Sequence, residues 1–145
     1  MVEVQPERVA PGEEVAPSGP ILVVGGAGYI GSHTVRVLQQ RGTPVVVVDN
    51  LSTGHRAAVD APFVEADLGD RAAIARVFEE HRPAGVIHFA AKCYVGESVQ
   101  EPSKYYRENV TYTWNLLEEM RAAGCERIVF SSTCATYGDP VERPM

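Results

Sequence analysis

A cluster of glycines and one acidic residue carry the clearest chemistry in this sequence of 145 residues. The apolar run 21–24 leads directly into Gly-Gly-Ala-Gly-Tyr-Ile-Gly at 25–31, and a helical pattern follows. The next apolar run, 45–48, ends in Asp49. These segments predict the parts of a dinucleotide site, namely a strand, a glycine-rich turn, a helix and a second strand that ends in a carboxylate.

Each glycine of the cluster has a physical reason to lack a side chain. One allows a tight turn, one lets the backbone approach a pyrophosphate, and one lets the helix pack closely on the strand. The spacing fits both Gly26-x-Gly28-x-x-Gly31 and Gly25-x-x-Gly28-x-x-Gly31. Free N–H groups at the start of the following helix would face the phosphates. A glycine turn alone can be a simple strand-to-helix connection, but here the strand, the helix and the acidic residue all favour a ligand.

Asp49 predicts which dinucleotide binds. Its carboxylate can accept hydrogen bonds from both ribose hydroxyls of the adenosine half, and its charge would repel a 2′-phosphate. We therefore expect NAD as the cofactor rather than NADP. The alternative role for Asp49 is that of a solvated turn residue at the end of a strand.

Length and composition indicate one ordinary globular domain. Hydrophobic residues make up 45% of the chain and charged residues 22%, which is typical of such proteins. The net charge of −6 argues against a nucleic-acid partner, and no apolar run is long enough to span a membrane. We expect residues 1–20, rich in Pro and Glu, to be a disordered leader, and residues 21–145 to form the domain.

Cysteine and histidine positions do not suggest a metal site. The three cysteines are widely spaced and lack the pairing of metal ligands, so free thiols in a reducing cytoplasm are expected. His33 and His88 are interpreted as a helix residue and a strand-end residue.

Apolar patterning predicts strands that alternate with helices. The predicted strands cover 21–24, 45–48, 63–65, 85–89 and 127–131. This order predicts an α/β fold with a doubly wound parallel sheet of the Rossmann type, incomplete after the fifth strand.

Three helices are predicted between these strands. The first covers 29–41, ends at Gly42, and has an apolar face of Ile30, Val35 and Leu38. The second is capped by Asp70 and has a stripe of Ile74, Val77, Phe78 and His81. A capping box at 98–101 begins a long helix to residue 123, with a predicted buried stripe of Tyr106, Val110, Trp114, Leu117 and Met120.

Several segments together resemble one protein family. They are 25–33, 49–52, 66–68, Val-Ile-His-Phe-Ala-Ala at 86–91, Val-Gly-Glu-Ser-Val at 95–99, Tyr-Tyr-Arg-Glu-Asn-Val at 105–110, and 130–138. They are similar to the amino-terminal part of the UDP-glucose 4-epimerases, which are extended short-chain dehydrogenases/reductases of the NAD-dependent epimerase/dehydratase family. The resemblance covers roughly residues 20–145. The glycine turn is common to the superfamily, whereas 28–33 and 95–99 point more narrowly to the epimerases.

The resemblance implies a set of NAD contacts. They are Gly25, Gly28, Tyr29, Ile30 and Gly31 at the pyrophosphate, Asp49, Asn50, Leu51 and Ser52 at the adenosine ribose, Asp67 and Leu68 at the adenine, and Phe89, Ala90, Ala91 and Asn109 elsewhere along the cofactor. Thr133 would hydrogen-bond the reacting sugar hydroxyl. Two residues depart from the family pattern. Val24 replaces the usual Thr, and a lysine stands one position early as Lys92, with Cys93 in its usual place, so neither is assigned a cofactor contact.

The resemblance also implies a reaction that needs a catalytic tyrosine, and this sequence lacks the motif that would contain it. In the family, a tyrosine accepts the proton of the sugar 4-hydroxyl while NAD takes the C4 hydride, and UDP-glucose and UDP-galactose interconvert. That tyrosine belongs to a Tyr-x-x-x-Lys motif whose lysine lowers its pKa. No tyrosine here has a lysine four residues later.

We therefore expect a truncated epimerase that holds NAD but does not act alone. The UDP-sugar domain of the intact family would be absent, and so would part of the family homodimer interface, which argues against a native dimer. A fragment of a related sugar-nucleotide dehydratase or reductase is an alternative. A non-catalytic NAD-binding module is another.

Overall fold

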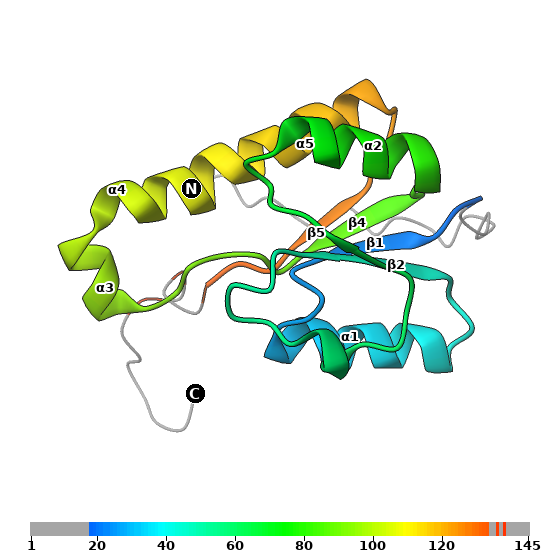
Figure 1. Cartoon of the computed structure of the whole chain (residues 1–145), viewed down its shortest axis with the longest axis horizontal. Coiled ribbons are helices and arrows are strands. Elements are labelled where there is room, and N and C mark those ends of the chain that lie inside the picture. Colours follow the sequence, from blue (N-terminus) through cyan, green and yellow to red (C-terminus); the bar gives the residue numbers. More distant parts are fainter. Residues whose placement is uncertain (1–17, 134–135, 137, 139–145) are drawn as a thin grey trace, which may run out of the picture.

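The computed structural model describes residues 18–133, 136 and 138, and a parallel sheet lies at its centre (Figure 1). The strand order is β3-β2-β1-β4-β5, and every neighbouring pair is parallel. The strands are β1 (Ile21–Val24), β2 (Val45–Asp49), β3 (Phe63–Glu65), β4 (Gly85–His88) and β5 (Ile128–Phe130). The predicted Rossmann-type α/β sheet is confirmed, with strand ends that differ from the prediction by at most one residue. The predicted leader lies mostly outside the described residues.

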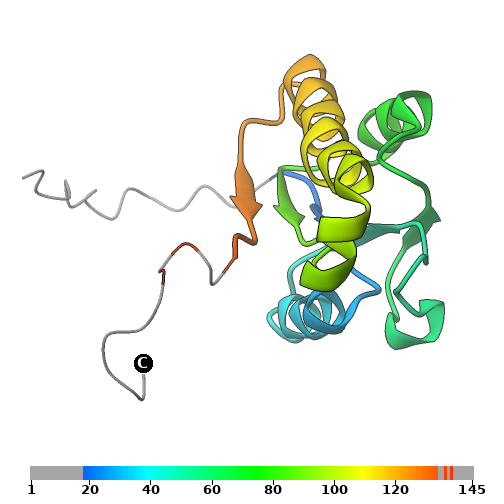
Figure 2. The same cartoon turned by 90° about the vertical axis from the view of Figure 1, so that its left-hand side faces the viewer.

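Helices cover both faces of this sheet (Figures 1 and 2). One face carries α1 (Tyr29–Gln40), and the other carries α2 (Arg71–His81) and α5 (Tyr112–Ala122). The remaining elements are η1 (Arg56–Ala58), α3 (Val95–Gln100), α4 (Pro102–Tyr105) and the π-helical segment η2 (Tyr106–Thr111), which runs directly into α5. None of the described helices is long and apolar enough to cross a membrane.

The central strands are buried on both faces, as their continuous apolar runs predict. In β1, Leu22 and Val24 belong to the core under α2 and α5, whereas Val23 belongs to the core under α1. All residues of β2 are buried in the same alternating way. Successive side chains of a strand point to opposite faces, so a sheet covered by helices on both sides needs apolar residues at every position.

The predicted boundary signals of α1 and α2 are confirmed. Asp70 caps α2, because its Oδ1 accepts a hydrogen bond of 3.0 Å from the Ala73 N–H. Gly42 and Gly124 follow the ends of α1 and α5 with φ of 72° and 68°, a conformation that glycine adopts without steric cost.

The predicted buried stripe of the long helix is wrong. Tyr106, Val110, Trp114 and Leu117 are between 40% and 71% exposed, and Met120 alone of the five is buried. The face against the sheet is formed instead by Leu116 and Met120, with Tyr112 partly buried. The helix has apolar residues on two sides, and the sheet covers only one. The wider π-helical turn of η2 also shifts the register between the two ends of the helix.

Two smaller predictions also fail. The predicted capping box at 98–101 is absent, because Ser98 lies inside α3 and its hydroxyl donates to the Val95 carbonyl at 2.7 Å. No side chain caps α4, which begins with Pro102. Ile30 is predicted on the buried face of α1 but is 60% exposed, and the buried residues of this helix are Gly31 and Val35.

His88 is a buried polar residue at the carboxyl end of β4, as its strand-end assignment implies. Its side chain is 2% exposed, and its Nε2 lies 3.1 Å from the Thr113 Oγ1. The Thr113 hydroxyl itself donates to the Asn109 carbonyl, so its oxygen accepts from an Nε2–H. The Nδ1 atom has no hydrogen-bond partner among the described residues. Burial lowers the pKa of His88 from 6.5 to about 4.

We predict that the free energy of unfolding falls as the pH drops from 6.5 to 4. In this window the unfolded chain binds a proton on residue 88 and the folded chain does not, so up to about 3 kcal/mol of stability is lost. Urea unfolding at several pH values measures the effect. His88→Asn should flatten the curve between pH 6.5 and 4, whereas His33→Gln, at an exposed histidine, should leave it unchanged. Identical curves for His88→Asn and the wild type would contradict the assignment.

Candidate dinucleotide site

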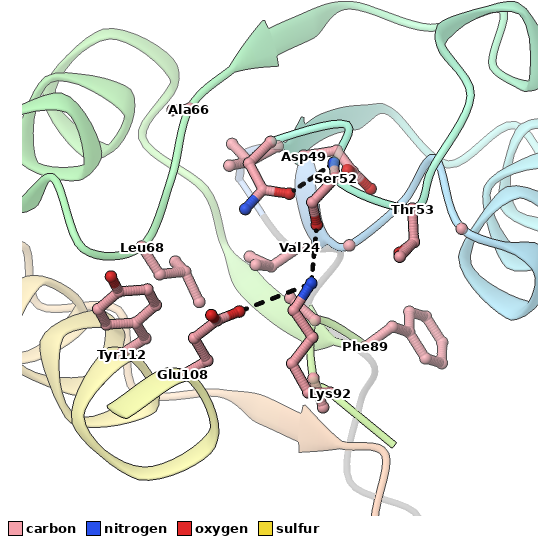
Figure 3. Close-up of a pocket in the computed structure, with 16 residues that line it drawn as sticks. Val24, Asp49, Ser52, Thr53, Ala66, Leu68, Phe89, Lys92, Glu108 and Tyr112 are labelled. Atoms are coloured by element: carbon pink, nitrogen blue, oxygen red, sulfur yellow. Dashed lines mark hydrogen bonds and ion pairs between the residues drawn. The ribbon is translucent and has the colours of Figure 1, made fainter. Parts of the chain in front are cut away.

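A pocket opens at the carboxyl ends of β1, β2 and β4 (Figure 3). It lies where the strand order reverses between β1 and β4, which is where doubly wound sheets bind ligands. The open space is about 650 Å³. The lining residues are Val24, Gly25, Gly28, Val48, Asp49, Asn50, Ser52, Thr53, Ala66, Leu68, Phe89, Ala90, Ala91, Lys92, Glu108 and Tyr112.

The glycine turn between β1 and α1 forms one wall of the pocket. Gly25 has a φ of 77°, and a Cβ there would lie 2.6 Å from the Ala90 amide nitrogen. A Cβ on Gly31 would overlap the Gly25 carbonyl oxygen. Both glycines are therefore required by the packing of α1 and the β4 loop against the turn.

Gly28 is different, because it faces open space. A Cβ there would meet only the Gly25 carbonyl oxygen, at 3.4 Å. Gly28 is also the residue before α1, and no side chain caps the first turn of that helix. The N–H groups at the start of α1, including those of Tyr29 and Ile30, are thus left for a ligand, and the positive end of the helix dipole favours an anion.

Asp49 lies at the end of β2 and is held rigidly. Its Oδ2 accepts from the Ala27 N–H at 2.9 Å, and its Oδ1 accepts from the Leu51 N–H at 2.8 Å. The residue is 8% exposed and lines the pocket. Each carboxylate oxygen can accept a further hydrogen bond, so the group can hold two hydroxyls of a ligand.

The predicted ribose and adenine residues lie side by side. The Asn50 Nδ2 donates to the Asp67 Oδ2 at 2.6 Å, and the Asn50 Oδ1 accepts from the Ser52 N–H at 3.0 Å. The other oxygen of Asp67 accepts from the Gly69 N–H at 2.7 Å. These bonds tie the loop after β2 to the loop after β3, two segments that the sequence places far apart.

The loop after β4 forms the opposite wall, where Phe89, Ala90 and Ala91 line the pocket. Asn109 does not line the pocket but fixes this loop. Its Oδ1 accepts from the Lys92 N–H at 2.8 Å, and its Nδ2 donates to the Lys92 carbonyl at 2.9 Å. Its direct contact with the cofactor stays a prediction.

Two other predicted residues, Leu51 and Thr133, do not line the pocket. Leu51, with a φ of 57°, supplies the N–H that Asp49 accepts and packs in the core under α1. Thr133 is exposed, beyond the carboxyl end of β5.

Sequence reasoning missed two charged residues of the pocket, Lys92 and Glu108. The sequence left Lys92 without a role and Cys93 in the usual lysine position, but the structure places the lysine in the pocket and Cys93 at the exposed surface. The sequence feature that could have indicated a role for Glu108 in the pocket is its position directly before Asn109. Among the described residues, no cluster of His, Cys, Asp or Glu could hold a metal ion.

The strand order, the glycine turn and the acidic end of β2 define a dinucleotide-binding α/β protein of the Rossmann type. Comparison with known protein families identifies the family within this class. The model of the NAD dependent epimerase/dehydratase family matches residues 21–145, and the chain belongs to this family. The resemblance noted in the sequence is thereby confirmed.

Several similar proteins are UDP-glucose 4-epimerases. That of Rhizobium leguminosarum bv. trifolii is 52% identical over 126 residues, which is 86% of this chain and 38% of the relative. The structure of the Brucella ovis enzyme in complex with NAD has a TM-score of 0.83 at 51% identity, over 88% of this chain and 40% of that one. The Thermotoga maritima enzyme, solved with UDP-glucose, has a TM-score of 0.79 at 41% identity, over 85% and 41%. The chain thus spans about two fifths of the length of these relatives.

We predict that two glycine substitutions affect different properties, the first the stability of the fold and the second the binding of NAD. Gly31→Ala should destabilise the fold by about 2 kcal/mol, because the new methyl group overlaps the backbone of the turn. Gly28→Ala should change stability by less than about 1 kcal/mol but weaken NAD binding about tenfold or more, because its methyl group stands where the diphosphate must approach. Urea unfolding and calorimetric NAD titration separate the two effects. The interpretation is wrong if Gly28→Ala binds NAD as the wild type does.

Proposed function

We propose that this chain is the NAD-binding portion of a UDP-glucose 4-epimerase, which interconverts UDP-glucose and UDP-galactose. The main support is the buried Asp49 carboxylate, which lines the pocket and is fixed by one backbone N–H group of the glycine turn and one of the loop after β2. The names of the similar proteins favour the epimerase over the dehydratases and reductases that share the fold.

The residues of the pocket fit NAD. Asp49 would accept the adenosine ribose hydroxyls, with Asn50, Leu51 and Ser52 beside it. Asp67 and Leu68 would contact the adenine. The first N–H groups of α1 would bind the diphosphate, while the small residues Ala90 and Ala91 leave room for the chain of the cofactor. NAD, when bound, supplies a reversible hydride acceptor.

Thr133 is proposed to hydrogen-bond the reacting sugar hydroxyl. The Ser131 N–H bonds the His88 carbonyl at 3.0 Å, which continues the pairing of β4 and β5 to the edge of the sheet at which the pocket opens. Thr133 follows two residues later, beyond the same ends of the strands. The free thiols of Cys93 and Cys125 are compatible with the cytoplasmic location that we propose.

We predict that the charge of Asp49 controls NAD affinity. Asp49→Asn keeps the shape but removes the charge and one acceptor, so NAD binding should weaken about tenfold or more, and the preference against NADP should shrink. Calorimetric titration with both dinucleotides measures this, and a thermal melt checks that the variant is folded. Asp60→Asn, an exposed aspartate outside the pocket, is the matched control. Unchanged NAD affinity in Asp49→Asn would overturn the assignment.

We also predict that the 145-residue polypeptide does not turn over UDP-galactose by itself. It contains the proposed NAD contacts but no Tyr-x-x-x-Lys pair, and therefore lacks the group that takes the proton from the sugar hydroxyl in the family. A coupled assay that detects UDP-glucose, with an intact epimerase as positive control, provides the measurement. Turnover above the enzyme-free blank would refute this part of the proposal.

A further inference from the structure

Lys92 is anchored at its backbone and extends its side chain into the pocket. Both main-chain polar groups of Lys92 are bonded to the Asn109 amide, which fixes the point from which the side chain starts. The Nζ atom then reaches the opposite wall and donates to the Ser52 Oγ at 3.2 Å (Figure 3). The side chain thus bridges the loop after β4 and the loop after β2.

The same ammonium group is paired with Glu108 of η2. The Lys92 Nζ lies 3.6 Å from the Glu108 Oε2, and the two side chains are 16% and 21% exposed. At such low exposure the pair is screened less by solvent than a surface ion pair. Figure 3 shows both interactions of the ammonium group within the pocket.

The lysine that could pair with a diphosphate in this pocket is already paired with a carboxylate. Among the described lining residues, Asp49 and Glu108 are acidic and Lys92 is the only cation. The NAD diphosphate brings two further negative charges into a space where charges interact strongly. The Glu108 carboxylate competes with a phosphate for the Lys92 ammonium, so the pairing makes this cation less available to a ligand.

Glu108 has a second cation available after such a release. The Arg107 guanidinium lies 3.8 Å from the Glu108 Oε1, the oxygen that Lys92 does not use. Loss of Lys92 therefore leaves the carboxylate with a cationic neighbour and partly exposed to water. This arrangement lowers the free-energy cost of breaking the ion pair between Lys92 and Glu108 when a ligand binds.

We propose that Lys92 and Glu108 form a counter-ion exchange. In the ligand-free pocket Glu108 holds the Lys92 ammonium, and on binding the dinucleotide diphosphate replaces the carboxylate as its partner. Glu108 thus lowers NAD affinity, and Lys92 raises it. The inference rests on the proposed binding of NAD by this chain.

A double-mutant cycle on the full 145-residue chain tests the exchange. NAD affinity is measured by calorimetry for the wild type, Glu108→Gln, Lys92→Met and the double variant. We expect Lys92→Met to weaken binding about tenfold, and Glu108→Gln to tighten it about fivefold. The gain from Glu108→Gln should be at least about threefold larger with Lys92 present than with Met at position 92, because only then does the substitution release an ammonium group.

Adenosine, which lacks the diphosphate, is the control ligand. Its affinity should change much less than that of NAD across the four proteins, because only NAD carries the diphosphate. Lys92→Gln replaces Lys92→Met if a thermal melt shows that the latter is unfolded. Equal gains from Glu108→Gln in the two backgrounds would show that the pair survives binding and would overturn the exchange. An equal response of adenosine and NAD would also overturn it. A wild-type chain that binds no NAD would instead refute the proposed function on which the exchange rests.

Discussion

The buried carboxylate of Asp49 is the group on which the pocket depends. It bonds the Ala27 N–H of the glycine turn and the Leu51 N–H of the loop after β2, and so joins two walls of the pocket through one side chain. A buried carboxylate is costly unless hydrogen bonds compensate the lost hydration. Here backbone donors supply them, so the charge is kept in a nearly dry position where it can act on a ligand.

The elements that the sequence predicts well are those with strong local patterns. The continuous apolar runs of β1 and β2 fit a strand that is covered by helices on both faces. Asp70 caps its helix by accepting from the N–H of Ala73, only three residues later. The long helix shows where this reasoning fails. Trp114 and Leu116 lie on different faces, both apolar, and sequence periodicity does not reveal which face the sheet covers. Only the assembled fold selects Leu116.

In the site, too, the residues that follow a short local pattern are predicted well, whereas contacts between distant segments are not. Gly25, Gly28 and Asp49 follow a short spacing rule, so the sequence was sufficient to place them in the pocket. The pairing of Asn50 with Asp67, and the bonds from Asn109 to Lys92, join segments 17 residues apart. Such contacts depend on how β2, β3 and η2 are arranged in space. The lysine that the sequence left without a role is for this reason the residue about which the structure adds most.

The order of the pocket residues along the chain has a consequence for synthesis. Every lining residue lies between Val24 and Tyr112, so no residue of β5 contributes to the pocket. A chain made from its amino terminus has all of these residues once the start of α5 has left the ribosome. The ends of β1, β2 and β4 can therefore form the pocket without a side chain from β5, the last described strand to be made.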